Sequence, residues 1–193
     1  VQGSSALLHH SKTVLNGKES VQLLLSYAFG NCVWSFLFSK QILDNNHIRF
    51  NENIGYGEDM LFLNQVFLKI KSLAILNSYL YYYRLNGGVT ASYSMRHAVD
   101  DWNVIQRLDT LYKGTSYLRE YSPYRFELLA VAYMCIPWKN RNTQERQLAS
   151  KLRTCMLKSF KIKYFKQMSK RHIFETSLIL LHVYEPLRRC FNW

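Results

Sequence analysis

Two adjacent carboxylates, Glu58 and Asp59, follow directly after the tight turn Gly55-Tyr56-Gly57. After them, apolar residues recur at three- and four-residue spacings as far as Ile70, which is typical of a helix that buries one face. Both carboxylates are therefore predicted to lie in the first helical turn, where the helix dipole favours their ionised forms. An ionised carboxylate can act as a general base that removes a proton from a hydroxyl group. The alternative is structural, with acidic residues at a helix start that only satisfy the dipole.

Other residue types that catalyse reactions or bind metals show no informative spacing. The six histidines and four cysteines form neither an H-E-x-x-H motif nor a Cys/His zinc pattern. The sequence also lacks a P-loop, a G-x-S-x-G motif and a G-x-G-x-x-G motif. Because no C-x-x-C pair occurs and the chain is not short and cysteine-dense, we expect reduced cysteines in a cytosolic protein.

The elements that must position these residues change in character near residue 95. Before it the pattern is mixed, with helices predicted at 19–29, 40–43 and 58–70, a strand or buried turn at 32–38, and one or two strands at 73–85. After it the pattern is helical, with helices predicted at 97–113, 123–135, 142–160 and 171–184. Ser122 and Pro123 indicate the second of these starts, and Glu145 indicates a capping box at the third. We therefore predict a domain over residues 1–95 and a helical, basic region over residues 96–193.

Four segments of the first domain carry a resemblance to a known family. In chain order they are Trp34 within V-W-S-F-L-F, Ile48-x-Phe50, Gly57-Glu58-Asp59-x-x-Phe62, and Tyr82-Tyr83-Arg84. Their order and spacing resemble the C-terminal half of the catalytic domain in family 2 glycosyltransferases of the GT-A fold, over roughly residues 10–95. The fold that the resemblance implies is α/β, with the acceptor-side half of a GT-A-like domain followed by an α-helical C-terminal region.

The resemblance also implies a function and roles for individual residues. The function would be inverting transfer of a sugar from a nucleotide-sugar donor to a hydroxyl of a glycan or lipid-linked acceptor, in the assembly of capsule or lipopolysaccharide. Asp59 would be the catalytic base, and Glu58 would orient Asp59 or the acceptor. Gly57 opens the motif and is counted with the substrate-binding residues.

Two further residues have competing explanations. An aromatic ring suits the apolar C–H face of a sugar, so Trp34 is a predicted acceptor contact, with a core tryptophan as the alternative. Arg84 ends the predicted strand and could reach a diphosphate, but a surface ion pair is the favoured alternative.

The chain departs from the family on the donor side. A family 2 enzyme begins with a nucleotide-binding half and carries a D-x-D-type motif that holds Mg or Mn against the diphosphate. This chain has no D-x-D motif, and Asp100-Asp101 falls in a predicted helix after the sheet. The resemblance therefore implies a divalent cation, Mg or Mn, for a full-length parent. The motif that would bind this cation is absent from this chain. Because the chain also begins at Val1, we expect a C-terminal fragment that is inactive in isolation.

The formal net charge of +12 is concentrated at the C-terminus. Residues 1–138 carry 12 Lys and Arg against 10 Asp and Glu, whereas residues 139–193 carry 13 against 3. Within residues 151–171 the basic residues alternate with apolar ones, which favours an anionic membrane surface as the partner. A solvated helix that covers the core is the second explanation. Nucleic acid is the least favoured, because no RNP-like, helix-turn-helix or zinc-finger pattern supports it.

Composition limits the remaining possibilities. With 48% hydrophobic and 20% charged residues the chain can form a packed core. The longest apolar run, at residues 128–138, is shorter than the roughly 18 residues that span a bilayer, and no signal peptide is visible. We expect a cytoplasmic protein, peripheral at the inner face of a bacterial membrane. The alternative function is a non-enzymatic basic helical module that binds a membrane surface or an anionic polymer.

Overall fold

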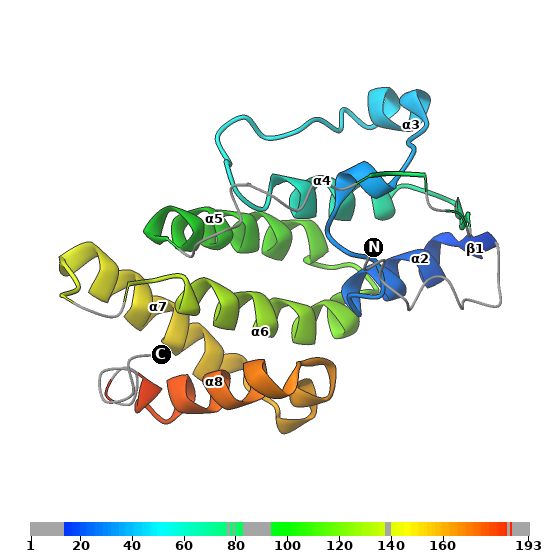
Figure 1. Ribbon diagram of the computed structural model, residues 1–193. Helices are drawn as coiled ribbons and strands as arrows, with labels where there is room; N and C mark the ends of the chain where they lie inside the picture. Colours follow the sequence, from blue (N-terminus) through cyan, green and yellow to red (C-terminus); the bar gives the residue numbers. More distant parts are fainter. Residues whose placement is uncertain are drawn as a thin grey trace. The chain divides into compact units, whose positions relative to one another are not determined.

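The computed structural model describes residues 14–76, 78, 80–82, 94–137, 140–184 and 186 of the 193-residue chain. These residues are mostly helical and include one two-stranded sheet (Figure 1). The mixed α/β class expected from the sequence fits at this coarse level. The chain divides into two compact units, the first of Val1–Gly88 with Gln106–Tyr121 and the second of Val89–Ile105 with Ser122–Trp193.

The sheet of the first unit joins two short segments that are far apart in sequence. Strand β1 (Val14–Asn16) pairs antiparallel with β2 (Ser72–Ala74), and Leu15 lies opposite Leu73. Between the strands lie α2 (Gly17–Leu25), the 3-10 turn η1 (Val33–Ser35), α3 (Lys40–Asn45) and α4 (Glu58–Phe67). Of the strands predicted over residues 73–85, the structure shows β2 at the start, whereas residues 75, 76, 78 and 80–82 are not in a strand. The other residues of that range lie outside the described part of the chain.

Helix α4 provides the apolar face on which this unit is built. Its residues Leu61, Phe62, Leu63, Val66 and Phe67 are buried, as the apolar spacing predicts. Ile48 is buried with Phe62 and Val66 in one cluster. Partly buried residues from η1, from the segment after it, from α3 and from the segment that follows α4 pack against this cluster: Val33, Phe38, Leu43 and Ile70. The 32–38 segment is therefore a turn, not a strand, and α4 holds it in place.

A close backbone contact fixes the start of α2. Asn16 caps this helix in a capping box with Glu19, whose backbone N–H donates to Asn16 Oδ1 at 2.9 Å. The next residue, Gly17, donates its N–H to the carbonyl of Lys71 at 2.8 Å. A Cβ at Gly17 would lie 2.5 Å from the carbonyl oxygen of Ile70, so only glycine allows this approach without a shift of the backbone. The β1–α2 junction therefore packs directly against the segment between α4 and β2.

Two tyrosine hydrogen bonds, one buried and one partly buried, complete the first unit. The last turn of α5 (Met95–Tyr112) carries Tyr112, whose hydroxyl donates to Asn64 Oδ1 of α4 at 2.6 Å. Tyr112 also stacks on Tyr121 with ring centroids 4.5 Å apart, and the Tyr121 hydroxyl donates to Asp109 at 2.8 Å. The burial of Tyr121 explains why α6 (Leu118–Met134) begins before the start predicted at Pro123, which lies inside the helix.

The second unit is helical in its described residues. It contains the first part of α5, most of α6, α7 (Thr143–Ser159), the 3-10 segment η3 (Ile162–Gln167) and α8 (Lys170–Leu180). Asn142 and Glu145 form the capping box at α7 that the sequence predicts. Arg153 of α7 donates to the carbonyls of Ile179 and Leu180 at 3.0 and 2.9 Å, so it caps the C-terminal end of α8. No helix within the described ranges is both long enough and apolar enough to cross a bilayer.

The contact at Gly17 leads to a stability prediction. Gly17→Ala should lower the free energy of unfolding by about 1–3 kcal/mol, because the new methyl group overpacks the Ile70 carbonyl. Gly30→Ala is the matched control, since a Cβ there meets only Cys32 Sγ at 3.6 Å, an ordinary contact. Urea denaturation followed by circular dichroism measures both. Equal stability of the two variants would contradict the close approach.

Candidate functional site

A hydrogen bond joins two of the segments that the sequence singles out. Asp59, in the first turn of α4, accepts a hydrogen bond at Oδ2 from the backbone N–H of Val33 at 3.2 Å. Val33 is the first residue of η1, and Trp34 is the second. The contact therefore brings the predicted base next to the turn that carries the predicted acceptor contact.

The Trp34 ring lies on the surface of η1 in a stacked pair. Its partner is Tyr81, with ring centroids 4.5 Å apart and planes inclined by 23°. Trp34 is 41% exposed and Tyr81 is 54% exposed. The sequence assigned Tyr81 only to a strand with one core face, and the run of tyrosines at 81–83 gives no signal for this pairing. The pair offers an aromatic surface beside the start of α4.

The negative charge of Asp59 affects the nearby thiol of Cys32. Burial, together with the negative charge of Asp59, raises the pKa of the Cys32 thiol. Glu58 and Asp59 are both half-buried, and neither takes part in an ion pair among the described residues. Asp59 thus lies at the N-terminal end of α4 and accepts the hydrogen bond of the Val33 N–H there.

Gly57 and the I-x-F segment set the direction of α4. Gly57 is the N-cap residue and has φ of 81°, a left-handed conformation that residues with a Cβ adopt only at a cost. Phe50 stacks on Phe62 with centroids 4.2 Å apart and planes inclined by 6°. These contacts turn the chain so that Glu58 and Asp59 begin the helix.

The fourth motif segment is only partly described. Tyr82 is fully exposed, whereas Tyr83 and Arg84 lie outside the described residues. The predicted contact of Arg84 with a diphosphate stays a prediction. The structure thus brings Trp34, Asp59 and the Gly57 turn together, and it carries no information on Arg84.

A metal site is not formed by the part of the chain that the structure describes. That part contains no group of three or more His, Cys, Asp or Glu side chains that could hold an ion. The divalent cation that the resemblance implies has no ligand set among these residues.

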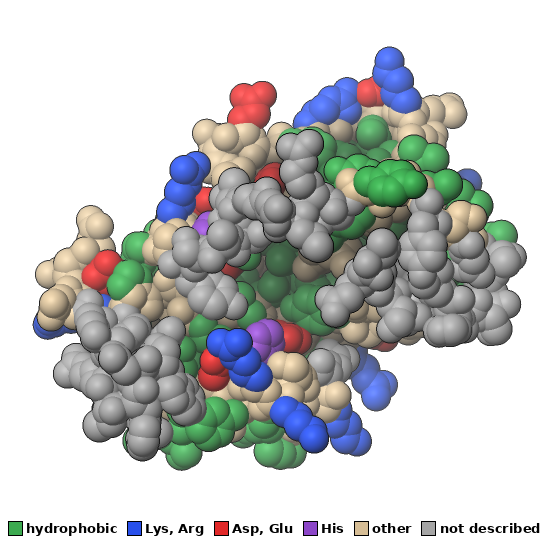
Figure 2. Space-filling model, viewed as in Figure 1, with side chains coloured by type: hydrophobic (Ala, Val, Ile, Leu, Met, Phe, Trp, Pro, Cys, Tyr) green, Lys and Arg blue, Asp and Glu red, His purple; other side chains and the backbone are tan. Residues whose placement is uncertain are grey.

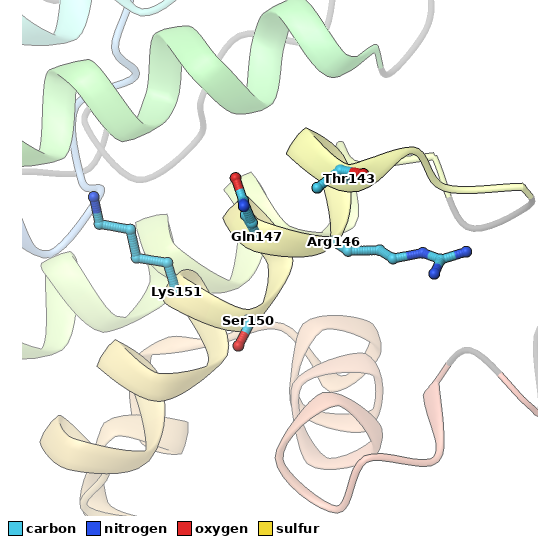
Figure 3. A pocket seen from close by; sticks show the side chains of 5 residues that line it. All are labelled: Thr143, Arg146, Gln147, Ser150 and Lys151. Atoms are coloured by element: carbon cyan, nitrogen blue, oxygen red, sulfur yellow. The ribbon is translucent and has the colours of Figure 1, made fainter.

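The second unit has a shallow hollow on the surface of α7. It has a volume of about 480 Å³ and is lined by Thr143, Arg146, Gln147, Ser150 and Lys151, all from this one helix. Figure 3 shows that these side chains point in different directions. Lys151 is engaged within the unit, since its Nζ lies over the ring of Trp102 at 4.6 Å. The hollow therefore has no converging set of polar groups, and none of its residues belongs to the predicted site.

Buried acidic side chains also occur in the second unit. Asp101 is 4% exposed, and burial together with the charge of Asp100 raises its pKa to about 7. Its Oδ2 is buried and has no hydrogen-bond partner among the residues that the structure describes. Burial and the charge of Asp101 raise the pKa of Cys135 to about 12. Asp100 lies 3.9 Å from Arg96, one helical turn earlier. These residues form a buried internal cluster, and Asp100-Asp101 is not a D-x-D motif.

A histidine links two helices of the same unit. His172 Nδ1 of α8 lies 3.1 Å from Glu127 Oε1 of α6, and this hydrogen bond raises the pKa of His172 against the opposing effect of burial. A raised histidine pKa stabilises the folded chain at low pH, and that contribution is lost as the pH rises through the folded-state pKa. The contact is a structural tie between α6 and α8.

The chain matches no protein-family model, no curated protein and no solved structure. The resemblance to family 2 glycosyltransferases therefore depends on the four motif segments. Among those segments, the structure records a hydrogen bond from the Val33 N–H to Asp59, and Trp34 follows Val33 in the chain.

The buried Asp101 predicts a pH dependence of stability. Its carboxyl binds a proton more tightly in the folded chain, with a pKa of about 7 against 3.8 when unperturbed. The unfolding free energy should therefore fall by roughly 2–4 kcal/mol as the pH rises from about 4 to about 7. Asp101→Asn should flatten this slope, measured by urea unfolding across that range.

The control for this experiment is Asp44→Asn, at a half-buried carboxylate that pairs with Arg49 at 2.6 Å. It should leave the slope between about pH 4 and 7 largely unchanged, because a surface ion pair contributes little. A parent slope that persists in Asp101→Asn would show that Asp101 is not the group responsible.

Proposed function

We propose that the first unit is the acceptor-side half of an inverting glycosyltransferase that resembles family 2 and has a GT-A-like fold. The observation that carries the proposal is the hydrogen bond from the Val33 N–H to Asp59 Oδ2. It joins two motif segments that are 26 positions apart and sets a carboxylate beside an exposed aromatic pair. A base there can take the proton of a sugar hydroxyl, and an aromatic surface beside it can hold the sugar ring.

The proposed chemistry on the acceptor side belongs to Asp59. An acceptor hydroxyl attacks the anomeric carbon of the donor sugar, a new C–O bond forms there, and the bond to the nucleoside diphosphate breaks. Asp59 takes the proton of the attacking hydroxyl. Oδ2 is held by Val33, so Oδ1 is the oxygen assigned to receive it.

The neighbouring residues orient the acceptor in this proposal. The partly exposed Trp34–Tyr81 stack provides the aromatic surface for the C–H side of a sugar ring. Glu58 orients the acceptor or Asp59 from the same helical turn, and Gly57 keeps the backbone open at the helix start. Arg84 is assigned to the diphosphate on the strength of the resemblance alone.

The donor side is assigned to other protein segments. This chain contains no D-x-D motif, and its described residues hold no metal-binding group. In the proposal, the nucleotide-sugar and its Mg or Mn ion are bound outside these residues. The acceptor is a glycan or a lipid-linked sugar of a bacterial capsule or lipopolysaccharide. A lipid-linked acceptor favours a location at the cytoplasmic face of the membrane.

Asp59→Asn in the full-length gene product tests this proposal. The asparagine Oδ1 can still accept the Val33 hydrogen bond, so the fold is preserved while the base is lost. We expect kcat to fall at least about 100-fold with little change in the KM for acceptor. The assay follows transfer of radiolabelled sugar from a panel of nucleotide-sugars to lipid and glycan extracts.

Glu58→Gln is the matched control, since it neutralises the neighbouring carboxylate in the same helical turn. It should lower activity less than Asp59→Asn, because Glu58 orients and does not take the proton. Full activity of Asp59→Asn, or no transfer by the parent protein, would contradict the proposal. Either result would favour the alternative, a non-enzymatic basic module.

A further inference from the structure

We propose that the segment from Leu157 to Lys166 docks the protein on an anionic membrane surface. This docking surface consists of Leu157, Lys158, Phe160, Lys161, Ile162, Lys163 and Lys166, at the end of α7 and along η3. The lysines contact lipid phosphates, and Leu157, Ile162 and the exposed part of the packed Phe160 ring face the boundary between headgroups and acyl chains. The proposal concerns the second unit and does not depend on the proposed transferase activity.

The structure separates basic residues with internal partners from those that face solvent. Among the eight basic residues of 151–171, Lys151 lies over Trp102, Arg153 caps α8, and Arg171 pairs with Glu175 at 3.1 Å. The other five are exposed lysines: Lys158, Lys161, Lys163, Lys166 and Lys170. The sequence from residue 146 to residue 174 contains no Asp or Glu. The positive charge of this surface is therefore not neutralised along its own segment.

Apolar side chains are exposed between these lysines. Ile162 is 72% exposed, Leu157 is 48% exposed and Phe160 is 38% exposed. Figure 2 shows hydrophobic and basic side chains next to one another over the C-terminal helices of the second unit, in the lower part of the view. Exposed apolar groups framed by lysines are the composition of a surface that lies in the headgroup region of a bilayer.

The backbone that presents these groups is anchored. Tyr164 is buried, and its ring centroid lies 5.6 Å from that of Phe126 of α6. Phe160 lies 5.8 Å from Phe126 and 5.5 Å from Phe165. Because η3 is fixed to α6 by these rings, little ordering is needed when the segment binds.

A lipid surface fits this segment better than a nucleic acid does. Its exposed cations are all lysines, whereas planar recognition of phosphates and bases favours arginine. Its phenylalanine rings pack on one another or on Phe126, so they do not form a free platform for base stacking. The most exposed apolar residue, Ile162, is aliphatic and suits acyl chains.

Vesicle co-sedimentation with the full chain tests the proposal. The probes are vesicles of phosphatidylcholine alone and of phosphatidylcholine with one quarter phosphatidylglycerol. We expect binding only to the anionic vesicles, with each lysine contributing roughly fivefold. The double variant Lys161→Glu/Lys163→Glu should therefore weaken binding at least about 25-fold. Ile162→Ser should weaken it roughly tenfold through the apolar term alone.

The matched control is Lys18→Glu/Lys69→Glu, which makes the same change in net charge at exposed lysines of the first unit. It should retain most of the binding, because these lysines lie outside the docking surface. If net charge alone caused the binding, both double variants would lose it equally. Equal loss in the two double variants, an unchanged Ile162→Ser, or tight binding of poly-uridylate RNA without vesicle binding would each overturn the proposal. Circular dichroism of every variant confirms that the helices are retained.

Discussion

The candidate site depends on one hydrogen bond, from the backbone N–H of Val33 to the carboxylate of Asp59. The bond fixes the η1 turn on the first turn of α4, and Trp34 follows Val33 in that turn. Oδ2 of Asp59 therefore has a structural role, and Oδ1 is the oxygen to which the proposed function assigns the proton. This double role makes asparagine more informative than alanine at this position, because alanine would release the turn as well as remove the charge.

Helix α4 makes this arrangement possible from two directions. Its buried face collects Ile48, Phe38 and Val33 around Phe62, so the segments before it must fold back over the helix. Its N-terminus begins at Gly57, whose φ of 81° lets the chain enter the helix with both acidic residues in the first turn. The hydrophobic face and the left-handed cap thus act together. Apolar burial holds η1 and the segments around it close to α4. The Gly57 cap sets where α4 begins, so that Asp59 lies within hydrogen-bonding distance of the Val33 N–H.

The parts that sequence predicts well are those governed by local rules. The capping box at Asn142 and the apolar face of α4 follow from spacing alone. Long-range contacts explain the rest: Tyr121 is buried against Tyr112 and extends α6 past Pro123, and Tyr81 pairs with Trp34 instead of continuing a strand. At the site, the sequence proposed Asp59 and Trp34 separately. Only the fold shows that the Val33 N–H links them.

The most direct measurement is an NMR titration of the chain with methyl glycosides of common hexoses and of N-acetylglucosamine. The account predicts that one of these sugars shifts the Trp34 indole N–H and the Val33 amide together, and that Trp34→Ala removes the response while Asp59→Asn keeps it. The titration needs no donor. Shifts confined to residues away from η1 and α4, or no shift with any of the sugars at saturating concentration, would contradict the account.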